Sequence, residues 1–135
     1  MYKPYVYGTM RKFHTKQFTV IADAIEETDI DLSWDEDGSV ARDIDSGKLS
    51  CFVARVRVFL GGREVGSDYL GNCVYQSVED FMDHKECGKQ NRQYAQAGET
   101  GRCGSYFSDM IHAAIAEARK TLKAEKQQLT TLYVR

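Results

Sequence analysis

Acidic side chains crowd residues 29–38, and carboxylates are the hard oxygen ligands that calcium prefers. A calcium loop of the EF-hand type places oxygen ligands at its first, third, fifth and twelfth positions around a glycine at the sixth. When Gly38 is set at the sixth position, Ser33 falls at the first and Ile44 at the twelfth. Isoleucine cannot replace the bidentate glutamate, so the spacing does not predict a calcium site.

The same acidic segment predicts a docking surface for a basic protein. Residues 23–45 hold ten acidic residues against Arg42 alone, a net charge of −9; the whole chain carries −2, so the remainder carries +7. Charge of this kind steers an encounter, and an aromatic side chain supplies area to bury. We expect the contacts to be Asp31, Trp34, Asp35, Glu36 and Asp37. The alternative is a solvated loop that Trp34 and Leu32 anchor to the fold.

Cysteine and histidine residues offer a set of candidate zinc ligands. A glycine follows both Cys87 and Cys103, as in the knuckles that often surround tetrahedral zinc, and His84 precedes the first of them. Paired C-x-x-C motifs, which make such a prediction specific, do not occur. A small zinc-containing protein or enzyme that uses Cys73, His84, Cys87 and Cys103, or His112 in place of Cys73, is kept as an alternative, and no cofactor is predicted.

Nucleophilic catalysis has little support in the residue pattern. His14, His84 and His112 lie on different segments, and no G-x-S-x-G turn occurs. A cysteine nucleophile paired with a distant histidine stays open, because such pairs form only in the folded chain. The sequence therefore predicts no catalytic residues and favours a protein that is not an enzyme.

A second docking surface is predicted in the polar and basic loop of residues 88–104. Lys89, Arg92 and Arg102, with Tyr94 and several glutamines, supply the cations, amides and aromatic ring that phosphates and bases need. The chain's isoelectric point near 5.9 argues against nucleic acid as the main partner, because that affinity comes chiefly from neutralising phosphates. A small nucleic-acid-binding module is the first alternative function.

The element that must position these sites is a β-hairpin over residues 49–75. Apolar residues alternate from Phe52 to Leu60, and Gly61-Gly62 supplies two residues free to adopt positive φ in a tight turn. If Leu60 pairs with Arg63, then Arg55 faces Asp68. That register places Phe52, Ala54, Val56, Val58, Val65 and Tyr69 on the core face.

Flanking segments complete a single α+β domain over residues 1–135. Residues 17–25 favour a strand, Ser77 favours the start of a short helix that ends near residue 88, and residues 129–134 favour a short strand or a frayed tail. Apolar residues spaced by three and four from Phe107 to Leu122 predict a long amphipathic helix. We expect an antiparallel sheet of three or four strands packed against this helix, with residues 28–47 irregular.

The address predicted from the sequence is the cytoplasm. Residues 1–10 lack the apolar core of a signal peptide, and no apolar run approaches the ~20 residues that cross a bilayer.

Two short segments of the chain have a recognisable pattern: residues 68–73, DYLGNC, and residues 104–110, GSYFSDM. Through them, residues 50–120 resemble short uncharacterised proteins encoded by bacteriophages and other mobile elements. It implies an accessory protein that binds a host protein, as inhibitors of restriction or CRISPR systems do. We therefore expect a protein-binding inhibitor whose acidic loop engages a basic surface of a nucleic-acid-processing host complex.

Overall fold

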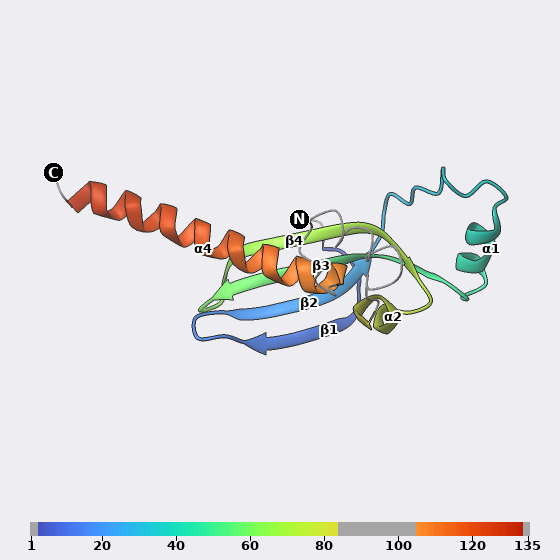
Figure 1. Ribbon diagram of the computed structural model, residues 1–135, viewed down its shortest axis with the longest axis horizontal. Coiled ribbons are helices and arrows are strands. Elements are labelled where there is room, and N and C mark those ends of the chain that lie inside the picture. The colour runs from blue at the N-terminus through green and yellow to red at the C-terminus, as the bar shows by residue number, and fades with distance from the viewer. Residues whose placement is uncertain (1–2, 84–104, 134–135) are drawn as a thin grey trace, which may run out of the picture.

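Four antiparallel strands and one long helix form the body of the protein in the computed structural model, which describes residues 3–83 and 105–133 (Figure 1). The sheet order follows the chain: β1 (Val6–His14), β2 (Thr19–Glu26), β3 (Ser50–Leu60) and β4 (Arg63–Tyr75). Helix α4 (Tyr106–Tyr133) crosses one face of the sheet. The short helix α2 (Val78–Asp83) lies at one end of the sheet. The predicted α+β class is confirmed.

The predicted hairpin forms, but its register was predicted correctly only next to the turn. Gly61 and Gly62 both have positive φ, and Leu60 pairs with Arg63 as expected. Phe59 then faces Glu64 while Val58 faces Gly66, so Val65 is an extra residue that bulges from β4. The bulge shifts every later pair by one residue. Arg55 consequently faces Tyr69 instead of Asp68, and Tyr69 leaves the core face to be 52% exposed.

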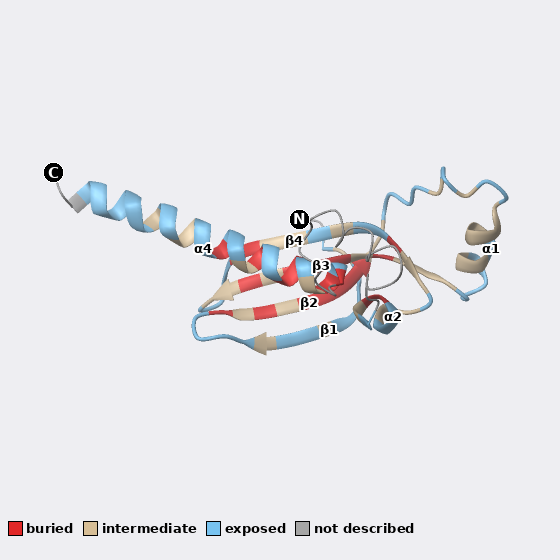
Figure 2. Cartoon of the chain, viewed as in Figure 1, coloured by how far each residue is buried: buried red, intermediate tan, exposed pale blue. Residues whose placement is uncertain are grey.

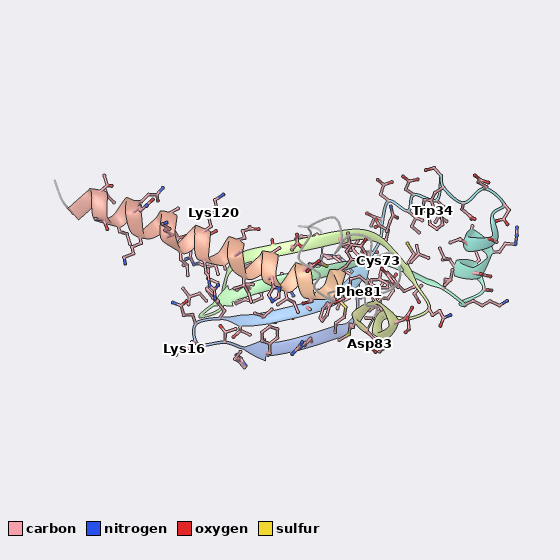
Figure 3. All side chains as sticks on the ribbon, viewed as in Figure 1. Lys16, Trp34, Cys73, Phe81, Asp83 and Lys120 are labelled. Atoms are coloured by element: carbon pink, nitrogen blue, oxygen red, sulfur yellow. The ribbon has the colours of Figure 1, made fainter. Side chains whose placement is uncertain are left out.

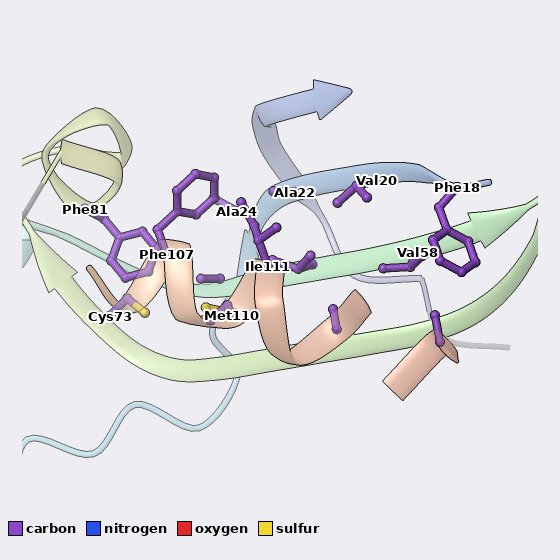
Figure 4. Packing of buried hydrophobic residues seen from close by; sticks show 14 of the residues in the cluster. Phe18, Val20, Ala22, Ala24, Val58, Cys73, Phe81, Phe107, Met110 and Ile111 are labelled. Carbon is purple, nitrogen blue, oxygen red and sulfur yellow. The ribbon is translucent and has the colours of Figure 1, made fainter. Parts of the chain in front are cut away.

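The core lies between α4 and the covered face of the sheet, where Figure 4 shows Phe107, Met110 and Ile111 pointing at the strands. Each such side chain contributes about 1.5–3 kcal/mol when fully buried. Gly66 permits the close approach, because a Cβ there would lie 2.4 Å from the backbone oxygen of Ala114. Only glycine therefore fits beneath this turn of α4.

Helix α4 is longer than the sequence pattern predicted. Ser105 caps it, with its hydroxyl accepting a hydrogen bond from the Ser108 amide at 3.0 Å. The helix continues to Tyr133, so the expectation of a strand or frayed tail over residues 129–134 was wrong for the described part. Its second half extends past the sheet, where Figure 2 shows mostly exposed residues.

Three other elements differ from the expectation or extend it. Strand β1 was missed because its residues are mostly exposed and lack an apolar alternation. Residues 28–47, predicted to be irregular, contain helix α1 (Ser39–Asp45). Helix α2 begins as predicted, with Ser77 Oγ accepting a hydrogen bond from the Asp80 amide, while its predicted end near residue 88 lies outside the described residues.

Candidate functional site

An acidic arm, residues 28–47, leaves the sheet between β2 and β3 and extends away from the body (Figures 1 and 3). It carries seven acidic residues and Arg42, a net charge of −6. The other three acidic residues of the segment 23–45 (Asp23, Glu26 and Glu27) lie outside the arm. No residue of α1 is buried. The arm is therefore shaped by hydrogen bonds rather than by a core.

One carboxylate and one amide fasten the arm to β4. Glu27 accepts hydrogen bonds from the backbone amides of Asp29 at 3.0 Å and Asn72 at 2.7 Å. The side-chain oxygen of Asn72 in turn accepts one from the Asp31 amide at 3.0 Å. Asn72 has a φ of 50°, a conformation that asparagine tolerates better than most residues, at a bulge where β4 has an extra residue.

Within the arm, aspartates hold the backbone around α1. Asp35 accepts hydrogen bonds from the amides of Val40 and Ala41 at 3.3 and 3.1 Å, which caps a helix whose N-cap residue is Gly38. Asp37 accepts one from the Ser39 amide, and Asp31 one from the Ser33 amide, each at 3.0 Å.

The bonds to the two serines favour the charged form of their aspartates. The backbone amide of Ser33 lowers the pKa of Asp31, and that of Ser39 lowers the pKa of Asp37; the hydroxyl of each serine adds to the effect. Both aspartates precede a serine by two residues, a spacing typical of turns closed by an aspartate side chain. That spacing was the signal in the sequence that two of the predicted contacts also hold the backbone.

The side chains of the arm that are free to meet a partner are partly those predicted. Trp34 is 57% exposed although its indole Nε1 donates a hydrogen bond to the Asp31 carbonyl oxygen, and Ile30 is 48% exposed. Four carboxylates make no hydrogen bond or ion pair with any described residue; these are Asp29, Glu36, Asp43 and Asp45. Of these six residues, only Trp34 and Glu36 were among the predicted contacts.

The face of the sheet opposite α4 carries a cluster of buried charge. Asp23, which is 3% exposed, accepts hydrogen bonds from the Arg55 guanidinium at 2.8 and 2.7 Å and from Arg57 at 3.2 Å. The carboxylate of Asp23 raises the pKa of Arg55. Among the described residues the buried Nε of Arg57 has no hydrogen-bond partner. Both guanidinium groups thus donate to Asp23. We therefore assign this charge cluster a structural role in the sheet.

The structure describes only some of the residues in the zinc-site and basic-loop predictions. Cys73 is buried, and burial raises the pKa of its thiol to about 11, which disfavours the thiolate that zinc needs. Residues 3–83 and 105–133 contain no group of three or more metal-binding side chains. The other residues of these two predictions, namely His84, Cys87, Lys89, Arg92, Arg102 and Cys103, lie outside the described residues.

A cavity of about 330 Å³ lies where β1, α2 and the start of α4 meet. Of the residues that the structure describes, Arg11, Asp83 and His112 are the charged or titratable ones in its lining, which also includes Phe13 and Phe107. The Arg11 guanidinium lies 5.0 Å from the ring centre of Phe13. Among residues 3–83 and 105–133, this lining offers binding groups for a small ligand and includes neither a cysteine nor a residue of the acidic arm.

Comparisons with protein-family models, with curated proteins and with solved structures gave no match. Within the part of the chain that the structure describes, none of the helices combines the length and apolar character that a membrane crossing requires.

Proposed function

We propose that the protein is a non-enzymatic binding protein whose acidic arm docks on a basic surface of another protein. The observation that carries this proposal is the exposure of Trp34 and Ile30 on a segment of net charge −6. Exposed apolar side chains inside a charged surface fit a docking site, because charge steers the encounter and the apolar side chains supply buried area. The hydrogen bonds of Asp31, Asp35 and Asp37 support it by pre-shaping the arm, which lowers the entropy cost of binding.

The partner that fits this surface best is a protein that itself binds nucleic acid. A groove that neutralises phosphates presents clustered lysine and arginine, and a row of carboxylates can occupy the same cations. The resemblance of residues 50–120 to phage proteins makes a host defence complex of the restriction or CRISPR type the partner we propose. The basic loop with Lys89, Arg92 and Arg102 remains the alternative, in which the protein binds nucleic acid directly.

The test is capture of a partner by an arm-reversed variant, in which Asp29, Glu36, Asp43 and Asp45 become lysine. These four carboxylates hold none of the arm's backbone hydrogen bonds, so the reversal changes charge and leaves the turns in place. The immobilised wild-type protein should capture a partner from bacterial lysate, and double-stranded DNA should then displace that partner. The arm-reversed variant should lose that capture.

A matched control places the same change of charge elsewhere. Glu64, Asp68, Glu79 and Asp83 lie outside both the arm and α4, and their reversal to lysine adds the same eight positive charges. This control should capture the partner as the wild-type does. Equal capture by the arm-reversed variant would refute the proposal, and a direct mobility shift of DNA by the wild-type would favour the nucleic-acid alternative.

A further inference from the structure

Helix α4 carries a charge opposite to that of the acidic arm, at the opposite end of the molecule. Residues 119–126 hold Arg119, Lys120, Lys123 and Lys126 against Glu125, a net charge of +3. The Glu125 carboxylate is taken by Arg63 of the hairpin at 2.8 and 2.9 Å, whereas the four cations form no ion pair with the described residues. Figure 3 shows Lys120 and Trp34 toward opposite ends of the long axis.

Exposed apolar side chains accompany the charge at both ends. Ile115, Leu122 and Leu129 are seven residues apart and so follow one side of α4. The first two are packed against the core, while Leu129 is 54% and Leu132 67% exposed beyond the sheet. A helix end without tertiary packing is marginal in water. A partner that covered this end would therefore stabilise it.

We infer that the partner is a second copy of the chain, in a two-fold dimer where each acidic arm lies against the α4 helix of the other copy. Charge complementarity selects this arrangement, because two α4 helices would repel each other and two arms would do so as well. A two-fold axis across the long axis makes both contacts at once, which closes the assembly. The inference rests on the proposed function, because it uses the arm as the acidic contact. It adds a form of regulation, since self-association and the capture of a foreign basic partner would compete for the same arm.

The test uses two variants of reversed charge. The arm-reversed variant defined above changes the arm from −6 to +2, because four reversals add eight charges. The helix-reversed variant, in which Arg119, Lys120, Lys123 and Lys126 become glutamate, changes residues 119–126 from +3 to −5. In either variant alone, arm and helix repel; in an equal mixture, both contacts of a mixed dimer are again between opposite charges.

Sedimentation equilibrium at low salt measures the outcome, with far-UV circular dichroism to confirm that both variants fold. Each variant alone should dimerise about a hundredfold more weakly than the wild-type, because several exposed ion pairs are lost and replaced by repulsion. The mixture should regain a dimer within about tenfold of the wild-type affinity. Raising salt from about 0.01 M to about 1 M should dissociate the wild-type, since the Debye length falls roughly tenfold.

Three results would overturn the dimer: a wild-type protein that stays monomeric at low salt, variants that dimerise as the wild-type does, or a mixture that stays monomeric. Lysate capture that still depends on the arm in a monomeric protein would leave the proposed function standing. If the dimer depends on charge as expected but lysate capture does not depend on the arm, the proposed function would be refuted instead.

Discussion

The body of the protein and its acidic arm use the same residue type for different purposes. In the sheet, Asp23 is buried and its carboxylate is fully engaged by Arg55 and Arg57. In the arm, Asp35 is bonded to backbone amides, and Glu36 makes no bond with any described residue. Burial decides the difference, because a buried charge must be paired while an exposed one need not be.

The two regions also differ in how they tolerate change. The body depends on close contacts such as that of Gly66 with α4, so a change there should alter the free energy of unfolding. The arm depends on a few exposed hydrogen bonds, so a change there should alter binding and local motion while the body stays folded. Stability thus belongs to the body, and the docking that we propose belongs to the arm.

The largest expected effect is that of removing the buried carboxylate of the body. Asp23→Ala leaves the Arg55 guanidinium buried without its partner, which should lower the free energy of unfolding by about 3–5 kcal/mol. Urea denaturation followed by far-UV circular dichroism measures it. The control is Glu125→Ala, which breaks the exposed pair with Arg63 and should leave the transition nearly unchanged. Equal effects of the two changes would contradict this contrast between buried and exposed pairs.

A smaller effect is expected from filling the space beneath α4. Gly66→Ala puts a Cβ against the Ala114 carbonyl oxygen and should cost about 1–3 kcal/mol of stability, because the helix must move outward. Gly8→Ala in β1 is the matched change, since a Cβ there meets nothing within 4 Å. The same denaturation experiment should find Gly8→Ala near the wild-type value, and a stable Gly66→Ala protein would show that α4 is not held this closely.

A change at the junction should separate the arm from the body. Asn72→Gly removes the amide that holds Asp31 and keeps a residue suited to positive φ, so about 0.5–1.5 kcal/mol of attachment is lost. Trp34 is the chain's only tryptophan, so its fluorescence anisotropy reports on the arm. The anisotropy should fall while the unfolding midpoint of the body changes little. Unchanged anisotropy would mean that the arm is held elsewhere.

The smallest effect is expected from acid. The lowered pKa values of Asp31 and Asp37 mean that their contribution to the arm's turns is complete above the ordinary aspartate value of 3.8 and is lost as pH falls through the lower folded-state pKa. Trp34 emission should therefore be constant at neutral pH and change only below about pH 3.8. In a variant with both aspartates replaced by asparagine this step should be absent. A transition nearer pH 6 would point to a different group, since about 6.5 is the ordinary pKa of histidine.

The sequence predicted the fold where local pattern and tertiary structure agree. The alternation in β3, the Gly61-Gly62 turn and the apolar spacing of α4 all specify one geometry. The sequence did not predict the register of β4, because the extra residue Val65 is a common strand residue and its type does not indicate a bulge. Strand β1 was missed for a related reason: at an exposed edge, side chains need not alternate in polarity.

The sequence located the acidic arm but not the hydrogen bonds that shape it. Charge density located the arm, and composition located Trp34. The set of carboxylates without hydrogen bonds depends on the bond between Asp31 and Asn72, which lie 41 positions apart. It also depends on helix α1, which the acidic composition of the arm did not predict. Long-range partners of this kind leave no trace in the spacing of residues along the arm.

Both edge strands of the sheet are interrupted twice. In β1 and again in β4, the pairing with the inner strand shifts at two places, and each shift inserts a residue into the edge strand. A kinked, twisted edge is a poor template for another strand. Growth of the sheet into amyloid-like fibres is thereby disfavoured even at high expression, and deletion of an inserted residue such as Tyr7 would straighten β1 and raise the tendency to aggregate.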